Sequence, residues 1–150
     1  MGMGQYLYRE SWLDDDDVEI VVKKAGKAVP LTNPSELVEE VAEWRKAYQI
    51  HYWFQKSYTA EGGGEIDDDT RVYADVEDIK ELLNVVGAVL KDKSKASELL
   101  PYNSKNDKGS YSEHYYWQLE DTKEMLEKVV EQHDSRVLSG SSYYRYEVSQ

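Results

Sequence analysis

The chain contains no cysteine, only one phenylalanine and three prolines in 150 residues. Without cysteine there are no disulfides, thiolate zinc sites, iron–sulfur clusters or cysteine nucleophiles. Basic residues are also few, because 18 Lys and Arg stand against 30 Asp and Glu, for a formal net charge of −12. This charge argues against direct binding of nucleic acid through phosphate neutralisation. Asn84 and Gly87 interrupt the longest apolar run, which stays well short of the roughly 18 residues that span a bilayer, so no membrane span is expected.

The composition is nevertheless that of a folded protein. Hydrophobic residues make up 40% of the chain and aromatic residues 12%, which is enough for a packed core. The length predicts a single domain, residues 1–150. Residues 1–6 lack the basic region and apolar stretch that open a secretion signal. The expected location is therefore the cytoplasm of the cell that makes the protein.

Strands are predicted near both ends of the chain. Large apolar and polar side chains alternate in residues 3–9, and residues 18–22 are rich in β-branched side chains. Asp14–Asp17 lie between them and favour a solvated turn, because four adjacent carboxylates repel one another in a regular element. We therefore expect an N-terminal hairpin, and we expect the alternating residues 143–148 to form a C-terminal strand.

A central helix is predicted at about residues 34–58. At 100° per residue, one face of this helix collects five side chains, Leu37, Val41, Trp44, Tyr48 and His51. Thr32 or Asn33 would cap the helix, and Pro34 would occupy its first turn.

Two further helices complete the prediction. Asp75 and Asp78 resemble a capping pair ahead of an apolar stripe that ends near Asp92, with a brief strand at Val72 and Tyr73 before it. A short helical turn is expected from Lys95 to Leu100, where Pro101 ends it. The third helix, at about 113–133, buries Tyr115, Leu119, Thr122, Leu126 and Val129. The predicted fold class is α+β, with three main helices around the central one and a small antiparallel sheet from the N-terminal hairpin and the C-terminal strand.

Common enzyme motifs are absent from the sequence. There is no Walker loop, dinucleotide glycine fingerprint, nucleophile elbow or histidine pair at metal spacing. The three histidines, at 51, 114 and 133, are scattered, which disfavours metal catalysis. Asp14–Asp17 and Asp67–Asp69 lack the alternating ligand spacing of a calcium loop and are interpreted as solvated charge runs. We expect no metal site and no cofactor.

Tyrosine is unusually frequent, with 13 copies against one phenylalanine. A tyrosine offers a flat apolar face and a hydroxyl, so it suits a wet interface or a pocket that stacks a planar ligand. A core whose hydroxyls reach the surface is the alternative interpretation. The aromatic clusters lie at residues 48–54, 111–117 and 143–146.

Arg45 and His51 border the apolar face of the predicted central helix. A cation in that position needs a partner, either a carboxylate of the chain or a ligand phosphate. For Arg45 alone, an internal ion pair is the favoured interpretation. With Lys46, Gln49 and Trp53 close by in the sequence, a ligand-facing surface is the alternative.

The stretch Glu43–Phe54 resembles the WRKANxIHxWF signature of small uncharacterised proteins encoded by tailed bacteriophages and prophages. The opening MGMGQYLY is similar to that family's MGLDMYLY start, Glu98–Pro101 to its ELLP segment, and Gly109–Ser110 to the start of its GSTEYDExY segment. The chain departs from the family pattern at Tyr48, where the family usually has Asn, and at His114, where an acid is common. The resemblance implies an early or accessory phage protein that acts in the cytoplasm of the bacterial host.

The resemblance also implies a counter-defence factor, since small phage proteins of this type often have that role. The favoured hypothesis is a sponge, which binds a nucleotide-derived immune signal through aromatic faces and cations without cleaving it. The ligand-binding residues predicted for it are Arg45, Lys46, Gln49, His51, Trp53, Ser110, Tyr111 and Tyr115. The tyrosine-rich surface favours a homo-oligomer, with a dimer as the first expectation.

Two alternatives stay open. One is an acidic inhibitor or DNA mimic that blocks a host defence protein and presents Asp14–Asp17 and Asp67–Asp69 on one face. The other is a hydrolase of a nucleotide signal, with His51 or His114 as the general base. No nucleophile is paired with either histidine in the sequence, so catalytic residues are not assigned.

Overall fold

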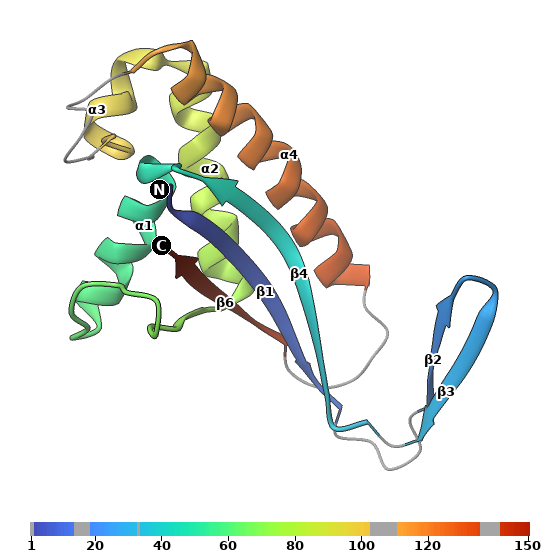
Figure 1. Ribbon diagram of the computed structural model, residues 1–150. Helices are drawn as coiled ribbons and strands as arrows, with labels where there is room; N and C mark the ends of the chain where they lie inside the picture. The colour runs from blue at the N-terminus through green and yellow to red at the C-terminus, as the bar shows by residue number, and fades with distance from the viewer. Residues whose placement is uncertain (1, 14–18, 33, 103–110, 136–141) are drawn as a thin grey trace.

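The computed structural model describes residues 2–13, 19–32, 34–102, 111–135 and 142–150. Its main sheet has four antiparallel strands in the order β4-β1-β6-β5 (Figure 1). These strands are β1 (Gly4–Trp12), β4 (Glu36–Arg45), β5 (Val72–Ala74) and β6 (Ser142–Ser149). A separate two-stranded sheet is formed by β2 (Glu19–Lys24) and β3 (Lys27–Thr32).

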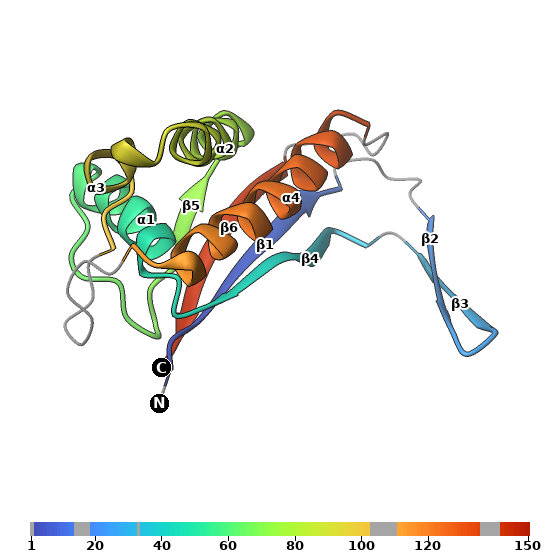
Figure 2. The ribbon, with the colours of Figure 1, turned by 90° about the horizontal axis from the view of Figure 1, so that it is seen from above.

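The helices cover one face of the four-stranded sheet, as Figure 2 shows from above. They are α1 (Tyr48–Ala60), α2 (Val76–Lys91) and α4 (Glu113–Ser135), with the short η1 (Lys93–Lys95) and α3 (Ala96–Leu99) following α2. The α+β class predicted from the sequence is therefore confirmed. No helix in the described ranges is both long enough and apolar enough to cross a membrane.

The core lies between this sheet face and the helices. Phe54 of α1 stacks on Tyr146 of β6, with ring centroids 4.0 Å apart and planes 6° from parallel. Trp44 of β4 donates its indole N–H to the Thr122 hydroxyl of α4 over 2.8 Å. The other fully buried side chains around them include Leu7, Ile50, Ile79, Leu82, Val86, Leu119, Leu126 and Tyr144.

Several predicted elements are confirmed. Asp75 caps α2, and its carboxylate accepts from the Asp78 N–H while Asp78 accepts from the Asp75 N–H. β5 and β6 form at the expected positions, and a helical turn ends just before Pro101. All five residues predicted to face the core from the third helix are buried: Tyr115, Leu119, Thr122, Leu126 and Val129.

The predicted central helix at 34–58 is wrong in its first half. Residues 36–45 form strand β4, and helix α1 begins only at Tyr48, so neither Thr32 nor Pro34 starts a helix. The physical reason is a β-bulge at Val41, because Leu7 pairs with Ala42 while Tyr8 pairs with Glu40. The extra residue breaks the two-residue alternation of the strand and leaves a three- and four-residue spacing that imitates a helix.

The predicted N-terminal hairpin is also wrong. β1 pairs with β4 and β6, whereas β2 pairs with β3. Ala25 and Gly26 both have positive φ, 51° and 78°, between the two paired strands. Two consecutive residues of this kind make the tight turn that hairpins favour, and closing such a short loop costs less entropy than joining 3–9 to 18–22. The predicted turn at Asp14–Asp17 lies outside the described residues.

Candidate functional site

A groove between the end of β4 and the first half of α4 is the best candidate site. Its volume is about 410 Å³. The strand side contributes Glu43, Trp44 and Arg45, and the helix side contributes His114, Trp117, Gln118, Asp121 and Met125. The helical residues lie three or four positions apart, except for the adjacent Trp117 and Gln118, so they form one stripe along α4.

A set of buried amides fixes the junction that places Arg45. The side chain of Gln5 accepts from the Ala47 N–H over 2.7 Å and donates to the Ala47 carbonyl over 3.0 Å. Gln118 of α4 donates to the Arg45 carbonyl over 3.0 Å, which ties the end of β4 to the helix. The chain can turn sharply here because Lys46 adopts a positive φ of 50°. Arg45 is thereby held at the rim of the groove.

Arg45 and Trp117 are the exposed cation and the exposed indole of the groove, beside the exposed Glu43, His114 and Asp121. Arg45 is exposed, and within the described residues its guanidinium makes no hydrogen bond or ion pair. Trp117 is 59% exposed, the largest fraction among the exposed large hydrophobic side chains. The His114 ring lies against it at 5.8 Å, with the planes 22° apart. An unpaired cation next to an open aromatic face is suited to a planar anion.

The groove also carries negative charge. Glu43 and Asp121 both line it, and both carboxylates are acceptors for N–H donors. Among the described residues that line the groove, Arg45 is the only Lys or Arg. The site therefore accommodates a ligand that has both N–H donors and a small negative charge, whereas a polyphosphate would meet repulsion.

Of the seven residues predicted to bind ligand that the structure describes, only Arg45 lines this groove. Gln49 and Tyr115 are buried, at 0% and 1% exposure. Gln49 donates to the Gln118 side chain over 2.9 Å, and its own Oε1 has no hydrogen-bond partner in the described part of the chain. Tyr115 donates to the Leu100 carbonyl over 2.6 Å, and burial raises the pKa of its hydroxyl. Both side chains serve the packing of α4.

The other predicted residues lie apart from the groove. Trp53 packs edge-on against Phe54, with ring centroids 5.1 Å apart, and Tyr111 packs edge-on against Tyr115 at the same distance. Lys46 is exposed at the turn beside Gly2. Ser110 lies outside the described residues.

His51 belongs to a buried network around Tyr146. Its Nδ1 lies 2.9 Å from the Tyr146 hydroxyl, which also accepts from Gln5 over 3.0 Å. Since that hydroxyl accepts from Gln5, its own hydrogen is available to His51, and Nδ1 acts as the acceptor of a neutral imidazole. Burial lowers the pKa of His51, with Glu65 opposing this effect. Partial burial therefore favours the neutral form of the ring at the edge of the core.

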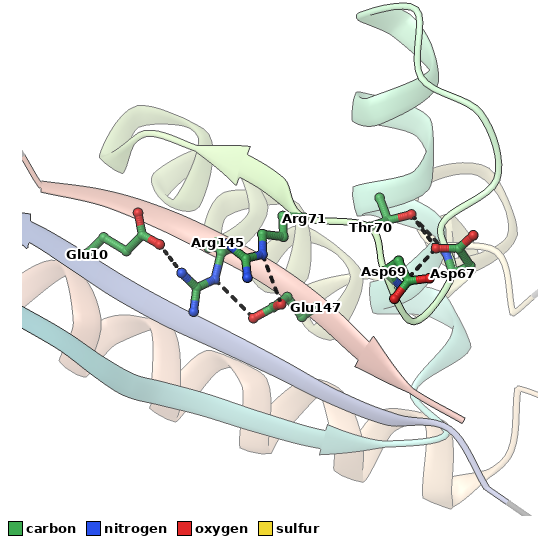
Figure 3. Close-up of polar contacts among 7 residues, drawn as sticks. All are labelled: Glu10, Asp67, Asp69, Thr70, Arg71, Arg145 and Glu147. Carbon is green, nitrogen blue, oxygen red and sulfur yellow. Dashed lines mark hydrogen bonds and ion pairs between the residues drawn. The ribbon is translucent and has the colours of Figure 1, made fainter.

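The opposite face of the sheet holds an ion-pair network, drawn in Figure 3. Arg145 pairs with Glu10 and with Glu147, whose carboxylate also lies 3.7 Å from Arg71. Although partial burial opposes the charge on Arg145, the attraction of Glu147 and Glu10 raises its pKa. The Arg145 guanidinium also lies 4.8 Å above the Tyr8 ring. These charges compensate one another and leave little for a ligand.

The acidic run at 67–69 forms a turn. The Asp67 carboxylate accepts from the Asp69 N–H and from the Thr70 hydroxyl, each over 2.9 Å, as Figure 3 shows. The Thr70 hydrogen bond is the main reason that the pKa of Asp67 is lowered. Across the residues that can be described, no three His, Asp or Glu side chains gather where they could hold a metal ion.

Sequence reasoning missed most of the groove. Trp117 and His114 drew attention as part of an aromatic cluster and as a candidate base, but Glu43, Gln118 and Asp121 did not. The spacing of 114, 117, 118, 121 and 125 was the available signal, since it defines a helix stripe next to the predicted core stripe. A scan against family models and searches of curated proteins and of solved structures find no match to this chain.

Proposed function

We propose that the protein binds a nucleotide-type ligand in the groove between β4 and α4 and releases it unchanged. The observation that carries the proposal is the exposed Arg45 beside the 59% exposed Trp117, since the Arg45 guanidinium makes no hydrogen bond or ion pair among the described residues. A large indole left in water at a concave surface is typical of a binding site rather than of a packing surface.

The groove residues divide the recognition of such a ligand among them. Trp117 stacks the base, a contact worth about 1–3 kcal/mol per base in proteins that bind single strands. Arg45 pairs with a phosphate, while Asp121 and Glu43 accept from amino or imino groups of the base edge. Since one arginine faces two carboxylates, the fitting ligand has few phosphates per base, as a cyclic nucleotide does.

Binding without cleavage agrees with the side chains of the groove. Among the described residues that line it there is no serine, threonine or cysteine, and His114 packs against Trp117 through its ring face. Together with the resemblance to phage proteins, this supports a phage accessory protein that sequesters a nucleotide-derived immune signal in the host cytoplasm. A homo-oligomer is part of the same proposal.

The test is a thermal-shift and ligand-recovery assay with cyclic di- and trinucleotides and ADP-ribose derivatives. We expect one compound to raise the melting temperature by several degrees, as mass action requires for a ligand well above its Kd, and to be recovered intact. Arg45→Ala and Trp117→Ala should each remove this shift. Arg71→Ala and Trp12→Ala, which change an exposed arginine and an exposed tryptophan away from the groove, should keep it.

Other outcomes separate the alternatives. A cleaved product would support the hydrolase, with His114→Gln as the variant to examine. If no compound shifts the melting temperature, or if the control variants lose the shift equally, the groove does not bind this ligand class.

The acidic inhibitor stays a second candidate because of the exposed carboxylates of α4. Glu113, Glu120, Asp121, Glu124, Glu127, Glu131 and Asp134 are all exposed along this helix. Such a surface fits a basic groove of another protein. Changing Glu120, Glu124 and Glu127 to Gln should abolish an inhibitory effect on host defence in infected cells, whereas Arg45→Ala should not. The opposite pattern would reject this candidate.

A further inference from the structure

The hairpin β2–β3, Glu19–Thr32, projects from the body as an arm. Its two strands pair with each other and with no other described strand, and Figures 1 and 2 both show it well away from the four-stranded sheet. Every side chain from Val21 to Thr32 is exposed. A two-stranded hairpin alone is marginally stable in water, so this arm needs a surface to pack on.

One face of the arm carries four large aliphatic side chains, while the other pairs Val21 with Pro30. Val22 pairs with Val29 and Ile20 with Leu31, so these four apolar side chains share one face. Lys24 and Lys27 stand at the tip of the same face. Val22 is 49% exposed and Val29 is 52% exposed. We call the face with Ile20, Val22, Val29 and Leu31 the apolar face of the arm. Val21, at 47% exposure, lies on the other face.

The charge of the arm is opposite to that of the rest of the chain. Lys23, Lys24 and Lys27 against Glu19 give the arm a charge of +2, whereas the whole chain carries −12. The body of a second copy is therefore electrostatically attractive to the arm. Two whole chains repel each other, whereas a contact that brings the arm of one copy to the body of the other is locally attractive.

The body offers a matching surface along its free sheet edge. β4 is an edge strand of the four-stranded sheet, and α4 packs beside it. A second groove of about 260 Å³ lies between them, toward the C-terminal half of α4. Its apolar lining is Val41, Met125 and Val129, and its polar lining is Asp121, Glu124, Lys128 and Gln132. Apolar residues flanked by carboxylates complement apolar residues flanked by lysines.

We propose that two copies exchange arms: the apolar face of each arm packs into the second groove of the other copy, along the free edge of β4. The lysines at the arm tip then meet the carboxylates of the partner's α4. The exchange is symmetric, so each favourable contact is made twice, and it also covers the edge of β4 that pairs with no other described strand. This inference specifies the homo-oligomer of the proposed function and does not depend on nucleotide binding.

The experiment is sedimentation velocity on the full chain across a concentration series. The wild type should sediment as a dimer. Val22→Asp, on the apolar face, should raise the dissociation constant about a hundredfold, because each of two symmetric contacts loses a buried valine. Val21→Asp is the matched control, with the same residue type, strand and exposure on the other face, and it should leave the dimer unchanged.

A charge exchange identifies the receiving surface. Glu124 lines the second groove, so Glu124→Lys should weaken the dimer about tenfold. Glu120 is exposed on the same helix outside the groove, so Glu120→Lys should leave the dimer unchanged. Adding Lys24→Glu and Lys27→Glu to Glu124→Lys should restore the dimer. Circular dichroism of each variant checks that the fold is kept.

Three results would overturn the proposal. The first is a wild type that is monomeric at every concentration. The second is equal weakening by Val21→Asp and Val22→Asp. The third is a dimer that Val22→Asp dissociates but Glu124→Lys leaves intact, which would mean that the arms pack on each other or elsewhere. Nucleotide binding is measured separately, so either proposal can fail alone.

Discussion

Tyr146→Phe is the sharpest test of the buried network around β6. The substitution keeps the ring that stacks on Phe54 at 4.0 Å and removes only the hydroxyl. Two hydrogen bonds are lost, one with Gln5 at 3.0 Å and one with His51 at 2.9 Å. Each is worth about 0.5–1.5 kcal/mol net. Because Gln5 keeps its bonds to Ala47, we expect a loss of about 2 kcal/mol in the free energy of unfolding.

The measurement is urea unfolding followed by circular dichroism, with a thermal melt beside it. A loss of about 2 kcal/mol corresponds to a melting temperature lower by about 4–8 °C for a chain of this size. Tyr143→Phe is the matched control, because Tyr143 lies on the same strand and is 44% exposed. It should change the stability by less than about 0.5 kcal/mol. Equal losses in the two variants, or none in Tyr146→Phe, would refute the assigned network.

Three further predictions concern pH, capping and packing. Burial lowers the pKa of His51 and of His133 below the 6.5 of the unfolded chain, so the unfolded state binds more protons in acid. The contribution of the two neutral histidines to the stability is full above about pH 6.5 and is lost as the pH falls from there through the folded pKa values. The urea midpoints at pH 7.5 and 5.5 should therefore differ less in a variant that carries both His51→Gln and His133→Gln than in the wild type. An unchanged difference would contradict this. Asp75→Ala should cost about 1 kcal/mol by removing the capping box of α2, against almost nothing for Glu81→Ala in the same chemical denaturation assay. Leu126→Ala should cost about 2–5 kcal/mol, since the side chain is fully buried; a smaller loss in calorimetry would mean that α4 packs less tightly than described.

The sequence predicted the elements whose signals are local. α2 has a capping pair and a regular apolar stripe, and α4 has a stripe of five core residues, so both helices follow from periodicity and capping. β4 was beyond this reasoning because its signal is not local. The bulge at Val41 exists only in the pairing with β1, and pairing partners cannot be read from one strand.

One residue of the candidate site, Arg45, was predicted from the sequence, but for a reason that the structure shows to be wrong. Arg45 was singled out as a cation at the edge of a helix face, but it stands at the end of a strand. Gln49 was assigned to a ligand because it is polar, yet it is buried against Gln118. A buried polar pair looks like an exposed one in sequence, since only the partner from a distant element distinguishes them.

The position of β1 in the sheet has a consequence for how the chain reaches its fold. β1 is the first strand in the sequence and its neighbour β6 is the last, with Gln5 and Tyr146 bonded across 141 residues. β5 is held in the sheet only through β6. At about 5–20 residues per second, ribosomal synthesis leaves one edge of β1 unpaired for roughly 5–20 s after β4 has emerged. We therefore expect refolding to be limited by the arrival of β6, in milliseconds to seconds, rather than by helix formation.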